Sequence, residues 1–367
     1  MSGVVMSGAV MSGAVMSEGR ARKPRFIDIA RHAGVGIATV DRVMNARGGV
    51  SAKTTRRVLD SARFLGVNRL LPEQSQRTLR LEVILHRAPT PYYERLNRAC
   101  HLAPKMVQEP VQVYITHIPV GKPARLRAHL NAIAPYRDGI ILYANDVPEN
   151  AEIIKKFVRQ LPVVTISTDI PDSGRHAYMG IDNRRAGETA ARLSEAFCRK
   201  GGKALIIEPD HAVAAQRLRA GGFADFFDKS GRSDQLVHLR PDTVPEYRLQ
   251  QIIALLEAEP DLRVLYSAVN DELQQLMAEA AGQRPVLNSL AKIVHDLSEE
   301  NITHLRAGQI DIVIDSNPLK QLVLAVDFLI SWHQGSTSLT DNFIDFDIFT
   351  AGNIPAGYPE IKSEERN

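Results

Sequence analysis

The chain has 367 residues, a formal net charge of +3 at pH 7, 44% hydrophobic residues and 24% charged residues. These values are ordinary for a soluble globular protein, and the length predicts two or three domains. No apolar run reaches the roughly 18 residues that would indicate a membrane span. Two cysteines, Cys100 and Cys198, lie far apart and support neither a disulfide framework nor a metal motif, so we expect a cytoplasmic protein.

The chain begins with a repeated pentad, read as MSGVV, MSGAV and MSGAV. A signal peptide needs a basic start and a longer apolar core, and the repeat has neither. Its glycine and serine residues disfavour a helix. We therefore predict that residues 1–22 are a disordered segment, with Met16 as a candidate true initiator.

Residues 23–66 are predicted to form a separate helical domain. Apolar residues recur at helical spacing over Ile27 to Ala33, over Ile37 to Met44, and again after Ser51, which can cap a third helix through its side-chain oxygen. Gly34 can adopt the left-handed backbone that ends the first helix. Two short helices joined by a glycine turn and braced by a third predict a helix-turn-helix.

In a helix-turn-helix the second helix enters the major groove of DNA, and its N-terminal residues meet base edges. Here those residues are Ile37, Ala38 and Arg42, since arginine can offer two donors to guanine and the apolar pair can contact a thymine methyl group. Four further polar residues are predicted to contact phosphates: Thr39, Asn45, Ser51 and Thr54. The alternative is an ordinary three-helix bundle with a solvated basic face.

Charge is unevenly distributed along the chain. Residues 20–80 contain fourteen basic and four acidic side chains, a net charge of +10, so the rest of the chain carries −7. A basic head of this kind attracts the phosphate backbone of DNA. The charge distribution therefore favours double-stranded DNA as a partner.

Residues 67–80 form a polar linker containing Pro72, and residues 81–356 alternate short apolar runs with longer amphipathic ones. This alternation predicts βαβ units and parallel sheets. Two successive series of predicted strands indicate two lobes. The first series is Leu81–His86, Val111–Thr116, Gly139–Tyr143, Val163–Ser167 and Ala177–Gly180, and the second is Ala204–Glu208, Leu236–Leu239, Val264–Ala268, Lys292–His295 and Asp311–Asp315. Helices are predicted between them, including 184–199 and 271–280.

The segment Asn342 to Phe349 alternates apolar and polar residues and predicts one edge strand, followed by a tail over residues 357–367. The predicted fold class is thus α/β, with an N-terminal all-α helix-turn-helix domain followed by a two-lobed domain with parallel sheets. The chain contains no phosphate-binding loop of the form GxxxxGK(S/T), no HExxH and no GxGxxG after a strand, so an enzyme is not expected.

Two sets of residues carry a resemblance to known families. The string IDIARHAGVGIATVDRVMN…VSAKTTRRV resembles the lactose repressor/galactose repressor family of bacterial transcription regulators, although Asp41 stands where a small hydroxyl residue is usual. The strings TPYYERLNRA, GIDNRRAGETAA, QRLRAGGF, VNDELQQL and VHDLSEE resemble a type I periplasmic sugar-binding protein. In the first family the linker forms a hinge helix, and Pro72 leaves that helix an open question here.

The second resemblance implies a ligand site at loops that follow strands, as expected for open α/β sheets. The predicted ligand-binding residues are Thr90, Tyr92, Tyr93, Asp169, Arg219, Asn270, Asp296 and Ser316. Tyrosine rings can stack on a sugar, and amide or carboxylate groups can bond its hydroxyls. Arg217 is the alternative to Arg219, and Asp271 next to Asn270 could instead cap a helix.

Together the two resemblances imply a sequence-specific DNA-binding regulator, expected to be a repressor whose operator affinity is controlled by a sugar or polyol. A homodimer is expected, because symmetric heads match palindromic half-sites. We expect no cofactor, no metal and no membrane partner. The alternatives are a solute-binding protein or an α/β enzyme acting on a sugar.

Overall fold

The computed structural model describes residues 24–45, 47–67, 78–87, 90–198, 201–208, 213–240, 245–269, 290–335 and 342–357. The chain divides into two compact units, Met1–Ser75 and Gln76–Asn367. Four predicted features lie outside the described residues: the N-terminal repeat, residues 68–77 of the linker, the helix over residues 271–280, and the tail after residue 357.

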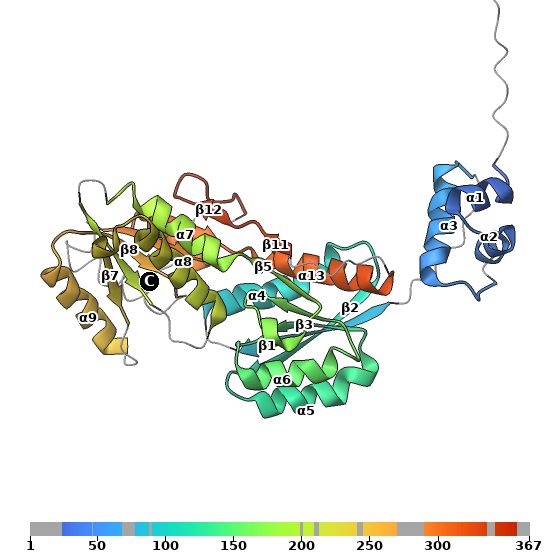
Figure 1. Cartoon of the computed structure of the whole chain (residues 1–367), viewed down its shortest axis with the longest axis horizontal. Coiled ribbons are helices and arrows are strands. Elements are labelled where there is room, and N and C mark those ends of the chain that lie inside the picture. The colour runs from blue at the N-terminus through green and yellow to red at the C-terminus, as the bar shows by residue number, and fades with distance from the viewer. Residues whose placement is uncertain are drawn as a thin grey trace, which may run out of the picture. The chain divides into compact units, whose positions relative to one another are not determined.

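The first unit contains three helices around a small apolar core (Figure 1). They are α1 (Phe26–Ala33), α2 (Ile37–Met44) and α3 (Ala52–Phe64). Gly34 ends α1 with φ 60°, and its N–H bonds the carbonyls of Ala30 and Arg31. Ser51 Oγ accepts a hydrogen bond from Thr54 N at 3.3 Å at the start of α3. The three predicted helices are therefore present.

The second unit has two lobes, each built on a six-stranded sheet. The sheet of the first lobe has the strand order β11-β5-β4-β3-β1-β2, and all its pairings are parallel. Its strands are β1 (Leu79–Arg87), β2 (Val111–Pro119), β3 (Gly139–Tyr143), β4 (Val163–Ile166), β5 (Ala177–Ile181) and β11 (Asn342–Ile344). Helices α4 (Pro91–Leu102) and α13 (Pro318–His333) pack on one face, and α5 (Pro123–Ile133) and α6 (Pro148–Phe157) pack on the other.

The sheet of the second lobe repeats this order as β12-β10-β9-β8-β6-β7. Its strands are β6 (Lys203–Ile207), β7 (Leu236–Leu239), β8 (Leu262–Ser267), β9 (Ala291–His295), β10 (Ile312–Asp315) and β12 (Asp347–Phe349). The helices described around it are α7 (Asn183–Ser194), α8 (Ala214–Lys229), α9 (Pro245–Ala258) and α12 (Glu299–Arg306). Short 3-10 helices occur at Ala103–Lys105, Ala134–Tyr136, Pro171–Ser173 and Ser233–Gln235.

Two predicted elements need correction. The single edge strand expected over residues 342–349 is wrong, because β11 pairs in parallel with β5 in the first lobe while β12 pairs antiparallel with β10 in the second. Only Asp345 and Phe346 separate the two strands, so the chain crosses between the lobes there. The helix predicted over residues 184–199 ends at Ser194.

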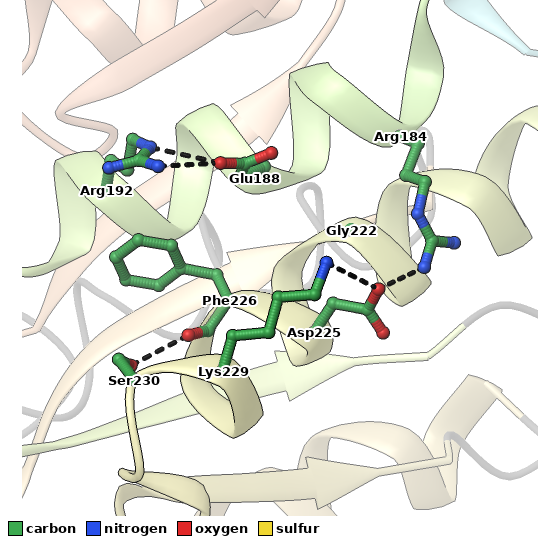
Figure 2. Close-up of a pocket in the computed structure, with 8 residues that line it drawn as sticks. All are labelled: Arg184, Glu188, Arg192, Gly222, Asp225, Phe226, Lys229 and Ser230. Carbon is green, nitrogen blue, oxygen red and sulfur yellow. Dashed lines mark hydrogen bonds and ion pairs between the residues drawn. The ribbon is translucent and has the colours of Figure 1, made fainter.

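Helices α7 and α8 cross at close range on the second lobe (Figure 2). A Cβ atom at Gly187 would lie 1.9 Å from the Arg219 carbonyl oxygen, and one at Gly222 would lie 2.0 Å from the Arg184 carbonyl oxygen. These two glycines therefore permit the backbones to approach. The close approach holds Arg219, on α8, beside the start of α7.

Candidate nucleic-acid interface and ligand site

Helix α2 presents one side to solvent and buries Val40, Val43 and Met44. We define the α2 face as the exposed residues Ile37, Ala38 and Arg42 together with the partly exposed residues Asp41 and Asn45. Ile37 is 50% exposed, although isoleucine is usually buried, and Ala38 and Arg42 are also exposed. The residues predicted to meet base edges thus lie together on one exposed helix face.

Asp41 places a carboxylate in the middle of the α2 face. Its Oδ2 accepts a hydrogen bond from Arg47 Nη1 at 2.7 Å, and its Oδ1 accepts one from Asn45 Nδ2 at 2.7 Å. The negative charge is therefore matched by a neighbouring arginine. Of the residues predicted to contact phosphates, Asn45 belongs to this cluster, while Ser51 and Thr54 bond each other at the start of α3.

In the second unit, eight buried residues are connected by hydrogen bonds and one ion pair: seven close a ring through side chains and two backbone carbonyls, and Tyr92 joins it through Ser167. We call this set the inter-lobe ring, and it consists of Tyr92, Ser167, Gln321, Ser316, Asp296, Arg219, Asn183 and Tyr178. Its members come from helices of both lobes, from the positions that follow β4, β9 and β10, and from β5. This is the edge at which open α/β sheets bind ligands.

The first-lobe half of the inter-lobe ring begins at Tyr92, whose hydroxyl pairs with Ser167 Oγ. Ser167 Oγ donates to Gln321 Oε1 at 2.9 Å, and Gln321 Nε2 donates to the Ser316 carbonyl at 2.7 Å. Tyr178 closes this half, because its hydroxyl donates to the Ser167 carbonyl at 3.1 Å.

The second-lobe half is charged. Ser316 Oγ donates to Asp296 Oδ1 at 2.6 Å, and Arg219 Nη1 lies 3.6 Å from Asp296 Oδ2. Arg219 Nε also donates to Asn183 Oδ1 at 2.8 Å. The side chains of Arg219 and Asp296 are only 5% and 2% exposed, so each charge needs the other in this low-dielectric position.

Backbone strain is concentrated at the same place. Among the described residues, the non-glycine positions with positive φ are Ser167 (64°), Asp296 (66°) and Asn317 (49°). Each follows the end of a strand, and two of them belong to the inter-lobe ring. Left-handed backbone at non-glycine residues is costly and clusters at functional sites. The strain therefore supports a functional role for this edge.

Burial also fixes the protonation of Tyr92. Burial, and secondarily the nearby Asp296 carboxylate, raises the pKa of Tyr92 to about 12. The hydroxyl therefore keeps its proton near neutral pH and remains a donor. The inter-lobe ring consequently offers a neutral hydroxyl, an amide, a guanidinium and a carboxylate within one connected group, a set suited to a polyhydroxylated ligand.

The structure joins Tyr92, Arg219, Asp296 and Ser316 in the inter-lobe ring, but it does not bring the other predicted residues there. Tyr93 points instead to His117 on β2. Thr90 caps α4 by accepting from Tyr93 N at 3.2 Å. Asp169 is held by Arg175, Thr165 Oγ1 and Ile170 N. Asn270 lies outside the described residues.

These departures have a local physical reason. Tyr92 and Tyr93 are consecutive on α4, and neighbouring positions on a helix point about 100° apart. The Tyr92 side chain therefore reaches the inter-lobe ring, and the Tyr93 side chain does not. Asp169 sits six residues before Arg175 in the turn between β4 and β5, where the pair satisfies itself. Arg217, the alternative to Arg219, pairs with Asp146 at 3.1 Å and is not in the ring.

Sequence reasoning missed Ser167, Asn183, Gln321 and Tyr178 as members of this group. Ser167 and Asn183 each follow a strand, where ligand-binding residues are expected, so the sequence contained a signal for both. Gln321 lies within α13, where no local pattern distinguishes it from a solvated helix residue. Its contact with Ser167 joins residues 154 positions apart and depends on the tertiary fold.

A pocket lies on the surface of the second lobe between α7 and α8 (Figure 2). Its charged side chains pair with one another: Arg192 Nη2 bonds Glu188 at 2.8 Å, and Asp225 is contacted by Arg184 and by Lys229. None of the predicted ligand residues lines it. We therefore place the candidate ligand site at the inter-lobe ring.

The fold and these two sites define the class: a small helix-turn-helix unit joined to a two-lobed binding protein of the α/β type. Residues 114–336 match the family described as "Periplasmic binding protein domain", and residues 26–66 match "Bacterial regulatory proteins, lacI family". The chain belongs to the periplasmic binding protein domain family, and its N-terminal unit is a helix-turn-helix domain of the lacI family.

Several individual proteins are similar to this chain. Catabolite control protein A from Staphylococcus aureus is 26% identical over 212 residues, a match that covers 56% of this chain and 61% of the relative. Among solved structures, a glucose-galactose binding protein from Geobacillus stearothermophilus has a TM-score of 0.63 at 22% identity, covering 76% of this chain and 99% of that one. A putative LacI transcriptional regulator from Bacteroides fragilis has a TM-score of 0.65 at 18% identity, covering 76% and 98%.

These structural matches establish the fold of the second unit. In the part of the chain that the structure describes, no helix combines the length and apolar character needed to cross a membrane.

Proposed function

We propose that the protein is a transcription regulator that binds double-stranded DNA through α2 and responds to a small carbohydrate or polyol held at the inter-lobe ring. The observation that carries the DNA-binding half is the α2 face, on which Ile37 and Arg42 lie exposed within a lacI-family helix-turn-helix. Such a protein would act as a homodimer in the cytoplasm, with two heads on a palindromic operator. Repression is the expected outcome of operator binding.

The ligand half of the proposal rests on the Arg219–Asp296 pair and the hydroxyls beside it. A sugar offers several hydroxyl groups that each donate and accept, so it can replace bonds that these side chains now make with one another. Three solved relatives of the fold support this class of ligand: a glucose-galactose binding protein, a solute binding protein in complex with D-arabinose and a carbohydrate transporter protein in complex with myo-inositol.

In vitro selection from a random DNA pool tests the DNA-binding half. We expect the full-length chain to enrich a palindromic sequence. Arg42→Ala should lower the affinity for the selected duplex by about 1–3 kcal/mol and relax the base preference at one position, because a bidentate base contact is lost. Enrichment of no sequence, or an unchanged preference in Arg42→Ala, would contradict the assignment.

A thermal-shift panel of sugars and polyols tests the ligand half. We expect at least one compound to stabilise the wild-type chain. Asp296→Ala should weaken its binding by one to two orders of magnitude, because the loss of one partner in a buried bond costs about 1–3 kcal/mol. Asp172→Ala, the same substitution at an exposed residue outside the inter-lobe ring, is the matched control and should bind as the wild type does.

A further inference from the structure

The α2 face contains a carboxylate where a DNA-binding surface has a physical reason to avoid one. Asp41 lies one helical turn after Ile37 and one turn before Asn45, so it sits on the same exposed stripe as the residues expected to meet DNA. An unmatched carboxylate at this position would repel phosphates. The side chain is 36% exposed, so burial does not hide it.

Both oxygens of this carboxylate have partners that come from the C-terminal end of α2 and the loop after it. Arg47 Nη1 and Asn45 Nδ2 each donate at 2.7 Å, one to each oxygen. The backbone contributes as well, because Arg47 N donates to the Arg42 carbonyl at 2.8 Å and ties the loop to the helix. Arg47 is therefore held at two points against α2.

The held arginine is still accessible. The Arg47 side chain is 64% exposed, and a guanidinium has five N–H donors in a fixed planar arrangement. The contact with Asp41 uses its Nη1 group. A carboxylate on one edge of a guanidinium leaves another edge able to bond a phosphate. Surface ion pairs contribute little to stability, so the arrangement is better explained by placement of the cation than by stabilisation of the fold.

We propose that Arg47 is a DNA phosphate-contacting residue and that Asp41 is its positioning residue. The proposal rests on the DNA-binding function proposed above. Arg47 follows the C-terminal end of α2, whereas base edges are met by residues at the N-terminal end of a recognition helix. Its contact is therefore with the backbone of the DNA and carries no sequence information.

The test measures the affinity of the full-length chain for a duplex selected by the wild type, by fluorescence anisotropy over a series of salt concentrations. Arg47→Ala should weaken binding about tenfold at low salt, by the loss of one charge-assisted bond. It should also reduce the slope of log K against log salt by about one, equally for selected and mixed-sequence DNA. Arg125→Ala, which removes an exposed arginine of the second unit, is the control and should change neither quantity.

Asp41→Ala is measured both in the wild type and in Arg47→Ala, because its effect on the affinity for DNA should depend on whether Arg47 is present. In Arg47→Ala the carboxylate has lost its cation, so adding Asp41→Ala should raise the affinity for DNA. In the wild type the same change also releases Arg47, so it should not raise the affinity. Arg47→Lys, which keeps the charge without the planar fork, should keep the salt slope but lose part of the affinity.

Three results would overturn the proposal. Arg47→Ala could leave affinity and salt slope unchanged, Arg47→Ala could alter preference at a single base pair, or Asp41→Ala could raise affinity equally in both backgrounds. Each of these requires that the wild type binds its selected duplex. A wild type that selects no DNA would instead contradict the proposed function itself. Circular dichroism of each variant confirms that the helical unit remains folded.

Discussion

At the scale of single residues, burial determines which groups carry charge. Arg219 and Asp296 form an ion pair inside the second unit, whereas burial favours the neutral form of two histidines at strand ends, His295 and His86. His295 is fully buried next to Asp296, and burial lowers its pKa well below the ordinary value. His86, at the end of β1, behaves in the same way, since burial lowers its pKa to about 4. Both histidines make the second unit sensitive to acid.

The direction in which pH changes stability follows from the protonation of His86 in the folded and unfolded states. Above about pH 7 both the folded and the unfolded chain hold His86 neutral, so it adds no pH dependence. Below its unfolded pKa of 6.5 the unfolded chain takes up a proton that the folded chain does not, and the free energy of unfolding falls until about pH 4. The loss approaches about 1.4 kcal/mol per pH unit for one histidine.

We therefore predict that His86→Gln loses less stability than the wild type when the pH is lowered from 7.5 to 5. Guanidinium unfolding, followed by the fluorescence of Trp332, measures this, because Trp332 is the chain's single tryptophan and lies on α13. His333→Gln, the same substitution at a partly buried histidine on α13, is the comparison. An identical pH dependence in His86→Gln and wild type would show that His86 titrates normally in the folded state.

At the scale of helices and strands, the sequence predicts those features that depend on a local pattern of residues. The bounds of α2, β3 and β7 were predicted from periodicity to the residue, and Gly34 ended α1 as expected. The division of residues 342–349 between two sheets was not predictable, because an alternating pattern does not specify which edge a strand joins. For the same reason Tyr92 and Tyr93 could not be told apart before the orientation of α4 was known.

The crossing of α7 and α8 provides a prediction at this scale. Gly222→Ala should destabilise the second unit by about 1–3 kcal/mol, because its Cβ would lie 2.0 Å from the Arg184 carbonyl oxygen and the helices would have to separate. Gly221→Ala, one residue earlier on the same helix, would meet only the end of the Arg184 side chain at 3.5 Å. It should be neutral or stabilising by up to about 1 kcal/mol, as for glycine replaced in a helix.

Urea unfolding of the two variants measures the difference. The matched positions share one helix and one substitution, so helix propensity cancels in the comparison. Equal stabilities would mean that α7 and α8 do not approach as closely as the structure shows. The separation of the helices in Gly222→Ala should also displace Arg219, which lies on α8 beside Asp296.

At the scale of the whole second unit, ion pairs connect the two lobes outside the inter-lobe ring. Arg95 on α4 bonds Asp315 at the end of β10 through two contacts of 2.6 and 3.1 Å, and Arg98 on the same helix bonds Glu299 at 3.0 Å. The first pair is nearly buried, with side chains 15% and 5% exposed, and the second is 61% and 66% exposed. The two pairs should therefore differ greatly in energy.

We predict that Arg95→Met destabilises the second unit by about 3–5 kcal/mol, because it leaves Asp315 charged and buried. Arg98→Met should cost less than about 1 kcal/mol, since both of its charges remain solvated. Calorimetry of the full-length chain, read at the transition of the second unit, distinguishes the two. A larger loss of stability in Arg98→Met than in Arg95→Met would contradict the expectation that the buried ion pair contributes more than the exposed one.

At the scale of the whole molecule, the proposed regulation requires linkage between the two units. A ligand can shift DNA affinity only by its differential affinity for the two states of the protein. The most direct measurement is the affinity of the full-length chain for its selected duplex, titrated with the compound that gives the largest thermal shift. We predict a change of about 5-fold to 150-fold in wild type. The change should require about 10-fold to 100-fold more compound in Asp296→Ala, the same factor by which its ligand binding is weakened. A compound that binds at the inter-lobe ring yet leaves DNA affinity unchanged at saturation would contradict the claim that this protein is a ligand-controlled DNA-binding regulator.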